Sequence, residues 1–271
     1  MVDANPDGRT ATRRGVLAAC SVSFTGVLAG CTNGLETNES AGNESNDEHH
    51  HHYHSAESRF TDEERSRALT TGKRVRESVA VLSGQRRGGN GTGGGTAWHI
   101  GDGYFVTNGH VVRQVTDIDL HTLDDRTVAA DVVENSMDPD VAVLRTDAPS
   151  VPAVTTGDES SLESEQPVLH VGHPALVGEW VISMGRFVEN GPFGVLTDVP
   201  SKRGYSGSPL ATLEGDVVGL TTGAVPRDRT GSPSDDPEPD GDTVHEELSG
   251  YTYAHHVPIS TVEDRLDEWT R

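Results

Sequence analysis

Short apolar runs of valine, leucine, isoleucine and threonine alternate with glycine-rich turns from about residue 78 to residue 225. Runs of this length between turn residues predict β-strands, and the lack of alternation between strands and helices favours a sandwich or a barrel over a parallel sheet. We therefore expect an all-β body. Its candidate strands are 78–82, 96–100, 104–107, 117–120, 126–134, 141–145, 167–171, 179–184, 187–189, 194–197, 209–213, 216–222 and 251–257.

A helical pattern precedes this body. Thr61 and Glu64 have the spacing of a capping box, in which each residue satisfies a backbone N–H of the first helical turn. Good helix formers follow as far as about Arg76. We therefore expect a short helix within 59–77.

A second helical pattern closes the chain. Ser260 and Glu263 repeat the capping-box spacing, and Val262, Leu266 and Trp269 recur on one helical face. This pattern predicts an amphipathic helix over 260–270 that docks on the strands.

The chain is strongly acidic. Lysine and arginine total 21 against 43 aspartate and glutamate residues, a formal charge of −22, and aromatic residues make up 5%. Such a chain is poorly suited to neutralising a phosphate backbone, so no nucleic acid partner is expected. Disordered chains share this composition, but the repeated apolar runs argue for a folded body. An acidic chain with only two lysines, Lys73 and Lys202, indicates a protein that stays hydrated in concentrated salt, and we infer a halophilic, archaeal source.

Residues 1–31 have the pattern of an export signal. Arg13 and Arg14 resemble a twin-arginine motif, and the weakly apolar stretch that follows is too short to span about 30 Å of hydrocarbon as a helix. The stretch ends in Leu-Ala-Gly-Cys, which is similar to a lipobox. We expect Cys31 to carry the lipid that anchors the exported protein to the outer face of the cell membrane. In the alternative reading, Cys31 is only a small residue near a cleavage site.

Residues 32–58 are rich in Asn, Glu, Ser, Gly and His and contain almost nothing that could pack. They predict a solvated, disordered tether between the anchor and the body. Histidines cluster around Tyr53 at 49–54. Such a run can bind transition metals, but it lacks fixed geometry and is also common in linkers, so we expect no defined metal site.

Three short segments each place a reactive side chain at the end of a predicted strand. His110 follows a polar turn, Asp140 precedes a buried strand, and Ser206 lies between glycines. A serine hydroxyl is a poor nucleophile unless a base accepts its proton and a third group orients that base. Glycines on both sides of the serine allow a tight turn whose backbone N–H groups converge on one point. The order His, Asp, Ser therefore predicts a catalytic triad of His110, Asp140 and Ser206.

On these residues the chain resembles the HtrA-like (Deg-type) branch of the chymotrypsin-fold serine proteases, over about 78–262. The resemblance implies a protease domain over 78–271 with two six-stranded antiparallel barrels, at about 78–160 and 165–258, and the catalytic groups in the cleft between them. The similar blocks are Gly94 to Ala97, Asp102 to Val112, Asp138 to Leu144, His170 to Pro174, Thr197 to Leu210, Gly215 to Leu220 and Val257 to Ile259.

The resemblance also implies roles for further residues. The N–H groups of Gly204 and Ser206 would form the oxyanion hole. Thr221, Thr222 and Gly223 occupy the positions that line the primary specificity pocket of the family, with small or medium apolar side chains as the implied preference. No cofactor and no metal are implied.

Three positions depart from the family pattern. Tyr205 stands where the family usually has Asn, Arg203 where this branch commonly has Pro, and Ser208 where it has Gly. Because Tyr205 is large, we expect it to tilt the Gly204 peptide and spoil the oxyanion hole in the resting state. The chain ends after the closing helix, so no C-terminal PDZ domain is expected.

Two further groups of residues have competing interpretations. The acidic segment 226–250 would overhang the substrate cleft and could attract basic substrates or bind Ca²⁺, but its composition favours a disordered loop. His170, His173, His255 and His256 are expected to be packed or exposed bystanders rather than metal ligands, because strand alternation turns the members of each pair apart.

The favoured function is an anchored serine endopeptidase that cleaves unfolded proteins in extracytoplasmic quality control. The alternative, suggested by Tyr205, is a catalytically silent chaperone-like or peptide-binding module on the same fold. A third reading, a metal-scavenging surface lipoprotein, rests on the histidines at 49–54. The expected partners are polypeptide substrates and, through the lipid anchor, the membrane. Family relatives suggest a homotrimer.

Overall fold

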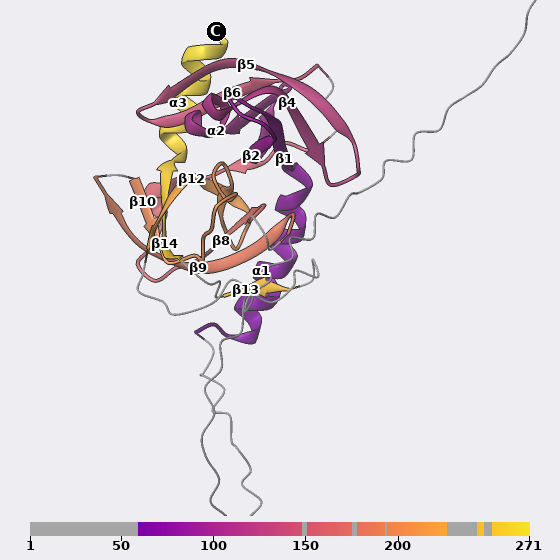
Figure 1. The fold of residues 1–271 in the computed structure, drawn as a ribbon. Coiled ribbons are helices and arrows are strands. Elements are labelled where there is room, and N and C mark those ends of the chain that lie inside the picture. Colours follow the sequence, from indigo (N-terminus) through magenta and orange to yellow (C-terminus); the bar gives the residue numbers. More distant parts are fainter. Residues whose placement is uncertain (1–58, 148–150, 175–177, 193, 227–242, 247–250) are drawn as a thin grey trace, which may run out of the picture. The chain divides into compact units, whose positions relative to one another are not determined.

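The computed structural model describes residues 59–147, 151–174, 178–192, 194–226, 243–246 and 251–271 (Figure 1). The predicted export signal with Cys31, the tether and its histidines lie outside these residues, as do 227–242 and 247–250 of the acidic segment. No helix in the described ranges has the length and apolarity needed to cross a membrane.

The first barrel is a closed antiparallel sheet with the strand order β1-β2-β3-β6-β5-β4. Along β4 the buried residues Ile118, Leu120 and Thr122 alternate with the half-buried Asp119 and His121, because successive side chains of a strand point to opposite faces. The strands are β1 (Val79–Arg86), β2 (Thr92–Gly101), β3 (Tyr104–Thr107), β4 (Val115–Thr122), β5 (Thr127–Met137) and β6 (Asp140–Arg145).

The second barrel closes through antiparallel pairs in the order β8-β9-β10-β14-β12-β11. Two short strands extend it in parallel, β7 (Thr155–Thr156) beside β12 and β13 (Val244–His245) beside β9. The predicted all-β fold of two six-stranded antiparallel barrels is confirmed. The barrel strands are β8 (Pro167–Gly172), β9 (Val181–Gly191), β10 (Gly194–Thr197), β11 (Pro209–Thr212), β12 (Asp216–Pro226) and β14 (Tyr251–Pro258).

An apolar cluster joins the two barrels. It includes Trp98 and Val106 from the first barrel and Leu169, Val171 and Ile182 from the second. Full burial of one such side chain stabilises the fold by roughly 1.5–3 kcal/mol, so the shared cluster holds the barrels firmly against each other. Side chains of the first barrel and side chains of the second barrel that face each other can therefore be held at fixed distances from one another.

Helix α1 (Asp62–Val75) packs against β8 and β9 of the second barrel (Figure 1). The predicted capping box is confirmed. The Thr61 hydroxyl accepts the N–H of Glu64 at 3.1 Å, and the Glu64 carboxylate accepts the N–H of Thr61 at 2.7 Å. This cap fixes the start of the helix one residue after Thr61.

Helix α3 (Ile259–Thr270) contacts strands of both barrels. Val262 is buried and Trp269 packs against the shared cluster, which confirms the predicted amphipathic helix. The predicted capping box at Ser260 is wrong. Ser260 lies within the first turn, and its N–H and hydroxyl both donate to the distant Glu159 carboxylate.

The strand predictions differ from the structure in two respects, and one is that the short strands β7 and β13 were not predicted. Residues 187–189 do not form a strand of their own but continue β9 as far as Gly191. The other candidates each overlap a strand of the structure. The short helix α2 (Gly109–Gln114) and the 3-10 turns at Arg76–Ser78 and Glu159–Ser161 were not predicted.

Candidate active site

His110 lies in the first turn of α2, between β3 and β4. Val111 and Val112 of the same helix are buried in the first barrel and hold the helix against it. Gly109 leaves no room for a side chain, since a Cβ there would lie 1.9 Å from the carbonyl oxygen of Ser136. This close approach brings His110 next to the turn that leads from β5 into β6.

Asp140, the first residue of β6, contacts His110 through both carboxylate oxygens. Its Oδ2 lies 2.6 Å from Nδ1 of His110, and its Oδ1 accepts the backbone N–H of His110 at 2.9 Å. A third hydrogen bond comes from the second barrel, where the Thr222 hydroxyl on β12 donates to Oδ2 at 2.5 Å. The carboxylate is therefore held in one orientation by groups from both barrels.

Hydrogen bonding keeps the Asp140 carboxyl ionised. Burial alone would raise its pKa, but the hydrogen bonds from His110 and Thr222 outweigh burial and hold the pKa below its ordinary value. An ionised carboxylate beside Nδ1 favours the imidazole tautomer that carries its proton on Nδ1. The lone pair of Nε2 is then directed at its other neighbour.

That neighbour is Ser206, whose Oγ lies 3.0 Å from Nε2 of His110. The serine lies on a turn in which Gly204 has φ 102° and Gly207 has φ 89°, backbone conformations that favour glycine. A Cβ on Gly207 would also lie 1.9 Å from the carbonyl oxygen of Thr96. The structure thus brings the three predicted residues together in one hydrogen-bonded row.

Strand β2 of the first barrel holds the serine turn. The N–H of Thr96 donates to the Ser206 carbonyl at 2.9 Å, and the Thr96 hydroxyl donates to the Gly204 carbonyl at 3.0 Å. The N–H groups of Gly204 and Ser206, by contrast, have no hydrogen-bond acceptor among the described residues. Both groups can therefore donate to an anionic oxygen, as an oxyanion hole requires.

The Tyr205 side chain points into the second barrel. It is completely buried, its ring stacks on His170 at 3.9 Å between centroids, and its hydroxyl lies 2.6 Å from the Ser183 hydroxyl. Burial raises the pKa of the phenol, so Tyr205 is neutral. The side chain fills the space behind the serine turn rather than the cleft, and the tilt of the Gly204 peptide stays a prediction.

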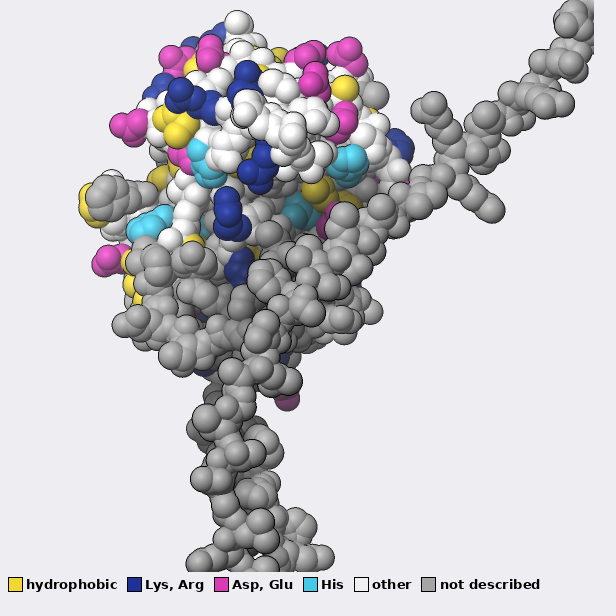
Figure 2. Space-filling model, viewed as in Figure 1, with side chains coloured by type: hydrophobic (Ala, Val, Ile, Leu, Met, Phe, Trp, Pro, Cys, Tyr) yellow, Lys and Arg dark blue, Asp and Glu magenta, His cyan; other side chains and the backbone are white. Residues whose placement is uncertain are grey.

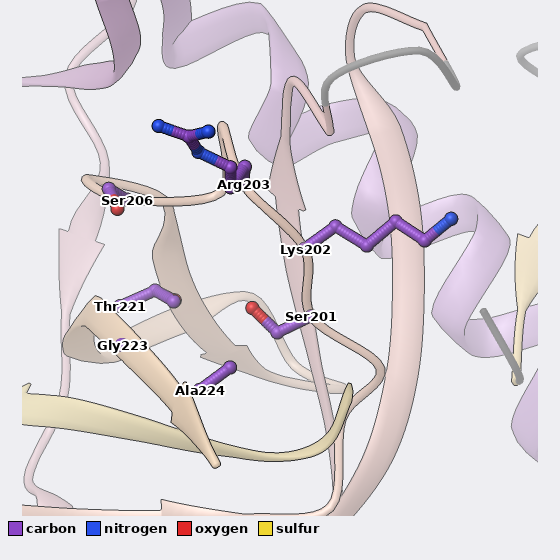
Figure 3. Close-up of a pocket in the computed structure, with 7 residues that line it drawn as sticks. All are labelled: Ser201, Lys202, Arg203, Ser206, Thr221, Gly223 and Ala224. Carbon is purple, nitrogen blue, oxygen red and sulfur yellow. The ribbon is translucent and has the colours of Figure 1, made fainter. Parts of the chain in front are cut away.

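A pocket of about 200 Å³ opens beside Ser206 (Figure 3). Figure 3 shows β12 on one side of it and Ser201 on the other, with the serine hydroxyl directed into the space. Five of its seven lining residues are Ser, Thr, Gly or Ala, and the other two are Lys202 and Arg203. The lining residues are Ser201, Lys202, Arg203, Ser206, Thr221, Gly223 and Ala224.

Two of the three residues predicted to line the pocket do so. Thr221 and Gly223 line it, whereas Thr222 does not and instead binds Asp140. Period-two alternation along β12 could have placed residues 221 and 223 on one face and 222 on the other. Ser201 and Ala224 were not predicted, because Ser201 lies in a loop without a strand pattern and β12 continues past the expected end at 222.

Comparison with known proteins relates this site to one class of enzyme. The family model described as a trypsin-like peptidase domain matches residues 95–220. Two relatives described as probable periplasmic serine endoprotease DegP-like, from Hahella chejuensis and Halomonas elongata, are each 34% identical over 129 residues, which cover 45% of this chain and 27% of theirs. The chain thus spans about a quarter of the length of these curated relatives.

Solved structures give the same fold. An HtrA-type protease, AlgW with tripeptide, is 23% identical with a TM-score of 0.59, over 73% of this chain and 62% of that chain. The serine endoprotease from Yersinia pestis is 22% identical with a TM-score of 0.58, over 74% and 66%. This likeness shows the chymotrypsin-like fold, and the family model and the relatives support a serine-type endopeptidase of the HtrA type.

Proposed function

We propose that this chain is a serine endopeptidase that hydrolyses peptide bonds through an acyl-enzyme on Ser206. The observation that carries the proposal is the unbroken row of hydrogen bonds from Ser206 Oγ through His110 to Asp140. A serine on a glycine turn, a base within reach of it and an ionised acid behind the base are the parts that acyl transfer needs.

In the first half of the reaction, Ser206 Oγ attacks the carbonyl carbon of the scissile bond while its proton passes to Nε2 of His110. The carbonyl oxygen becomes an oxyanion, and the N–H groups of Gly204 and Ser206 donate to it. The carbon–nitrogen bond then breaks, His110 gives the proton to the leaving amine, and the acyl group stays on Ser206. Asp140 stabilises the imidazolium throughout.

In the second half, a water molecule takes the place of the leaving amine. His110 accepts a proton from this water while the water oxygen attacks the acyl carbon. The new oxyanion accepts hydrogen bonds from the same two N–H groups. The proton then returns to Ser206 Oγ as the ester bond breaks. The enzyme regains its starting state, and no cofactor takes part in this sequence.

The pocket beside Ser206 lies where the side chain that precedes the scissile bond would enter. Thr221 and Gly223 line it, as the resemblance to the HtrA-like proteases implies together with a preference for small or medium apolar side chains. We propose that the enzyme prefers the smaller residues at this position.

The cellular role is proposed from the relatives and the sequence. The relatives are described as periplasmic, which supports an exported protein. With lipid attachment at Cys31, the protease domain would work on the outer face of the membrane as a trimer, on unfolded polypeptides in quality control.

A covalent probe tests the proposed activity. The full chain, folded in multimolar KCl, is treated with a fluorophosphonate and assayed on unfolded casein beside the Ser206→Ala variant. We expect labelling and cleavage by the parent and neither by the variant. A folded parent that does not label would contradict a working oxyanion hole and favour the silent binding module.

A further inference from the structure

A second hollow, of about 590 Å³, lies next to Ser206 on the side of the first barrel. It shares Arg203 and Ser206 with the pocket of Figure 3, but its other walls come from β1, β2 and α2 rather than from β12. Arg86 at the end of β1 and His110 on α2 both line it. The catalytic serine therefore stands between two spaces of different composition.

The position of His110 indicates which part of a substrate each space receives. His110 lines the second hollow and not the first pocket. In the proposed mechanism, Nε2 of His110 gives its proton to the leaving amine, so the amine must lie on the His110 side of Ser206. The second hollow, called here the leaving-group hollow, thus receives the residues that follow the scissile bond.

Two arginines line the leaving-group hollow without a carboxylate partner. Among the described residues, Arg203 makes neither an ion pair nor a hydrogen bond, and Arg86 donates through Nε to the carbonyl of Thr92 at 2.8 Å. Both side chains are exposed. Other arginines of this acidic chain do pair with carboxylates, Arg59 with Asp198, Arg67 with Glu214 and Arg265 with Glu268, although Arg74, Arg87, Arg113 and Arg145 also have no carboxylate partner among the described residues.

Basic side chains also occur together on one face of the molecule. Figure 2 shows lysine and arginine side chains near the middle of the face that it presents. In Figure 3 the Arg203 side chain extends from the turn on the side of Ser206 and away from β12, while Lys202 extends in the opposite direction. Arg203 is thus directed to where the leaving chain must pass.

We propose that the leaving-group hollow is a carboxylate-binding subsite in which Arg203 and Arg86 select substrates with Asp or Glu in the first two positions after the scissile bond. A guanidinium group binds a carboxylate through two parallel N–H donors, a geometry that lysine does not offer. This inference rests on the proposed function for its assignment of sides. It adds a preference on the leaving side to the small-residue preference of the pocket.

Binding to an inactive protein tests the subsite without relying on catalysis. Three fluorescent peptides have valine before the scissile-bond position and Glu-Glu, Gln-Gln or Lys-Lys after it. Each peptide ends in an amide, so that the Glu side chains are the only carboxylates tested. Their affinities for the full-length Ser206→Ala protein are measured by anisotropy at one fixed KCl concentration. A matched Gln-Gln peptide with a free C-terminus tests whether a terminal carboxylate also binds.

We expect the Glu-Glu peptide to bind about 3- to 10-fold more tightly than the Gln-Gln peptide, and the Lys-Lys peptide to bind most weakly. Adding Arg203→Gln should bring the Glu-to-Gln ratio to about 1, and Arg86→Gln should lower it in part. Arg203→Lys should retain part of the ratio, since the charge stays but the paired donors are lost. Arg271→Gln, at an exposed position at the end of the chain, is the matched control and should keep the full ratio.

Equal affinity for the Glu-Glu and Gln-Gln peptides, or a ratio unchanged by Arg203→Gln, would overturn the subsite. Tighter binding only of the free C-terminus would overturn it in favour of a site for chain ends. The proposed function is judged separately, by fluorophosphonate labelling of the parent with Ser206 intact. If the parent protein fails to label while the ratio of Glu-Glu to Gln-Gln affinity is as expected, the proposed enzyme activity is refuted and the carboxylate-binding site is retained.

Discussion

The two barrels differ in the polar side chains that they bury. In the first barrel the largest fully buried side chains are hydrophobic, namely Trp98, Phe105, Leu82, Leu120 and Leu144. Apart from the indole N–H of Trp98, these side chains have no group that needs a hydrogen-bond partner, because they stabilise the barrel by burial of apolar surface. The groups of this barrel that carry chemistry, His110 and Asp140, lie outside that core, in α2 and at the start of β6.

The interior of the second barrel contains a polar layer. His170 and His256 are both completely buried, and the Thr221 hydroxyl lies between them, 3.4 Å from Nδ1 of His170 and 3.0 Å from Nδ1 of His256. The other ring nitrogens are satisfied too, since Nε2 of His170 donates to the Pro200 carbonyl at 3.0 Å and Nε2 of His256 lies 2.9 Å from the Thr197 hydroxyl. Each ring nitrogen of His170 and of His256 therefore has a partner.

The polar layer stands directly behind the serine turn. Tyr205, the residue before Ser206, stacks on His170. A partly satisfied buried network is costly, whereas a satisfied one fixes a single arrangement of its members. We infer that the second barrel has polar side chains at interior positions behind the serine turn because their hydrogen bonds fix the turn that carries Ser206. The first barrel keeps an apolar core and presents its catalytic side chains at the edge.

The largest expected effect comes from breaking the contribution of the first barrel, with Asp140→Asn. An amide nitrogen facing Nδ1 of His110 favours the tautomer with its proton on Nε2, which cannot accept the Ser206 proton. We expect kcat to fall by about 10⁴-fold with little change in melting temperature, because the apolar core is untouched. Steady-state kinetics on a peptide substrate and thermal unfolding measure the two quantities. Activity within tenfold of the parent would contradict the role of Asp140.

The next effect is a sensitivity to acid that comes from three buried histidines at residues 170, 173 and 256. Burial lowers the pKa of His170 to about 3, that of His173 to about 3, and that of His256 well below its ordinary value. Between the ordinary value of 6.5 and about 3, the unfolded chain binds protons that the folded chain does not. Stability is therefore complete above pH 6.5 and is lost as the pH falls below it.

Each of these histidines contributes about 1.4 kcal/mol per pH unit in this window, so all three together contribute roughly 4 kcal/mol per unit at most. Denaturant unfolding at constant ionic strength between pH 7 and pH 5 measures the slope. His170→Gln removes one of the protons that only the unfolded chain binds, so it should reduce the slope of the unfolding free energy against pH by about 1.4 kcal/mol per pH unit. A slope that His170→Gln leaves unchanged would contradict a neutral, buried His170 in the folded protein.

Short-range patterns in the sequence predicted much of the fold and the candidate triad. His110, Asp140 and Ser206 each lie in a local motif in which the neighbouring residues already indicate a turn or a strand end. The capping box at Thr61 was predicted in the same way, because its two partners are three residues apart. The strands were found because their apolar runs are separated by glycine-rich turns.

The remaining features depend on contacts between residues far apart in the chain. The cap expected from Ser260 fails because Glu159, about a hundred residues earlier, competes for its N–H and hydroxyl. Helix α2 has only six residues, too few for a helical period to stand out. The inward direction of Tyr205 follows from its stacking on His170, which no local pattern encodes.

The smallest effect tests the hydrogen bond between the two barrels, from Thr222 of the second barrel to Asp140 of the first. Thr222→Val keeps the shape of the side chain but removes the hydroxyl that donates to Asp140 Oδ2 at 2.5 Å. The pKa of Asp140 should rise toward its ordinary value, because one of the hydrogen bonds that lower it is lost. A single hydrogen bond to a charged group contributes about 1.5–3 kcal/mol to stability. The two bonds from His110 still hold the Asp140 carboxylate in the variant, so we expect only the lower end of this range to appear in catalysis, as about a tenfold fall in kcat. Thr222→Ser retains the donor and should recover most of the parent rate. If the valine variant keeps the parent rate and the serine variant loses activity, the methyl group and not the hydroxyl holds Asp140, and the two barrels would then cooperate at this point through packing alone.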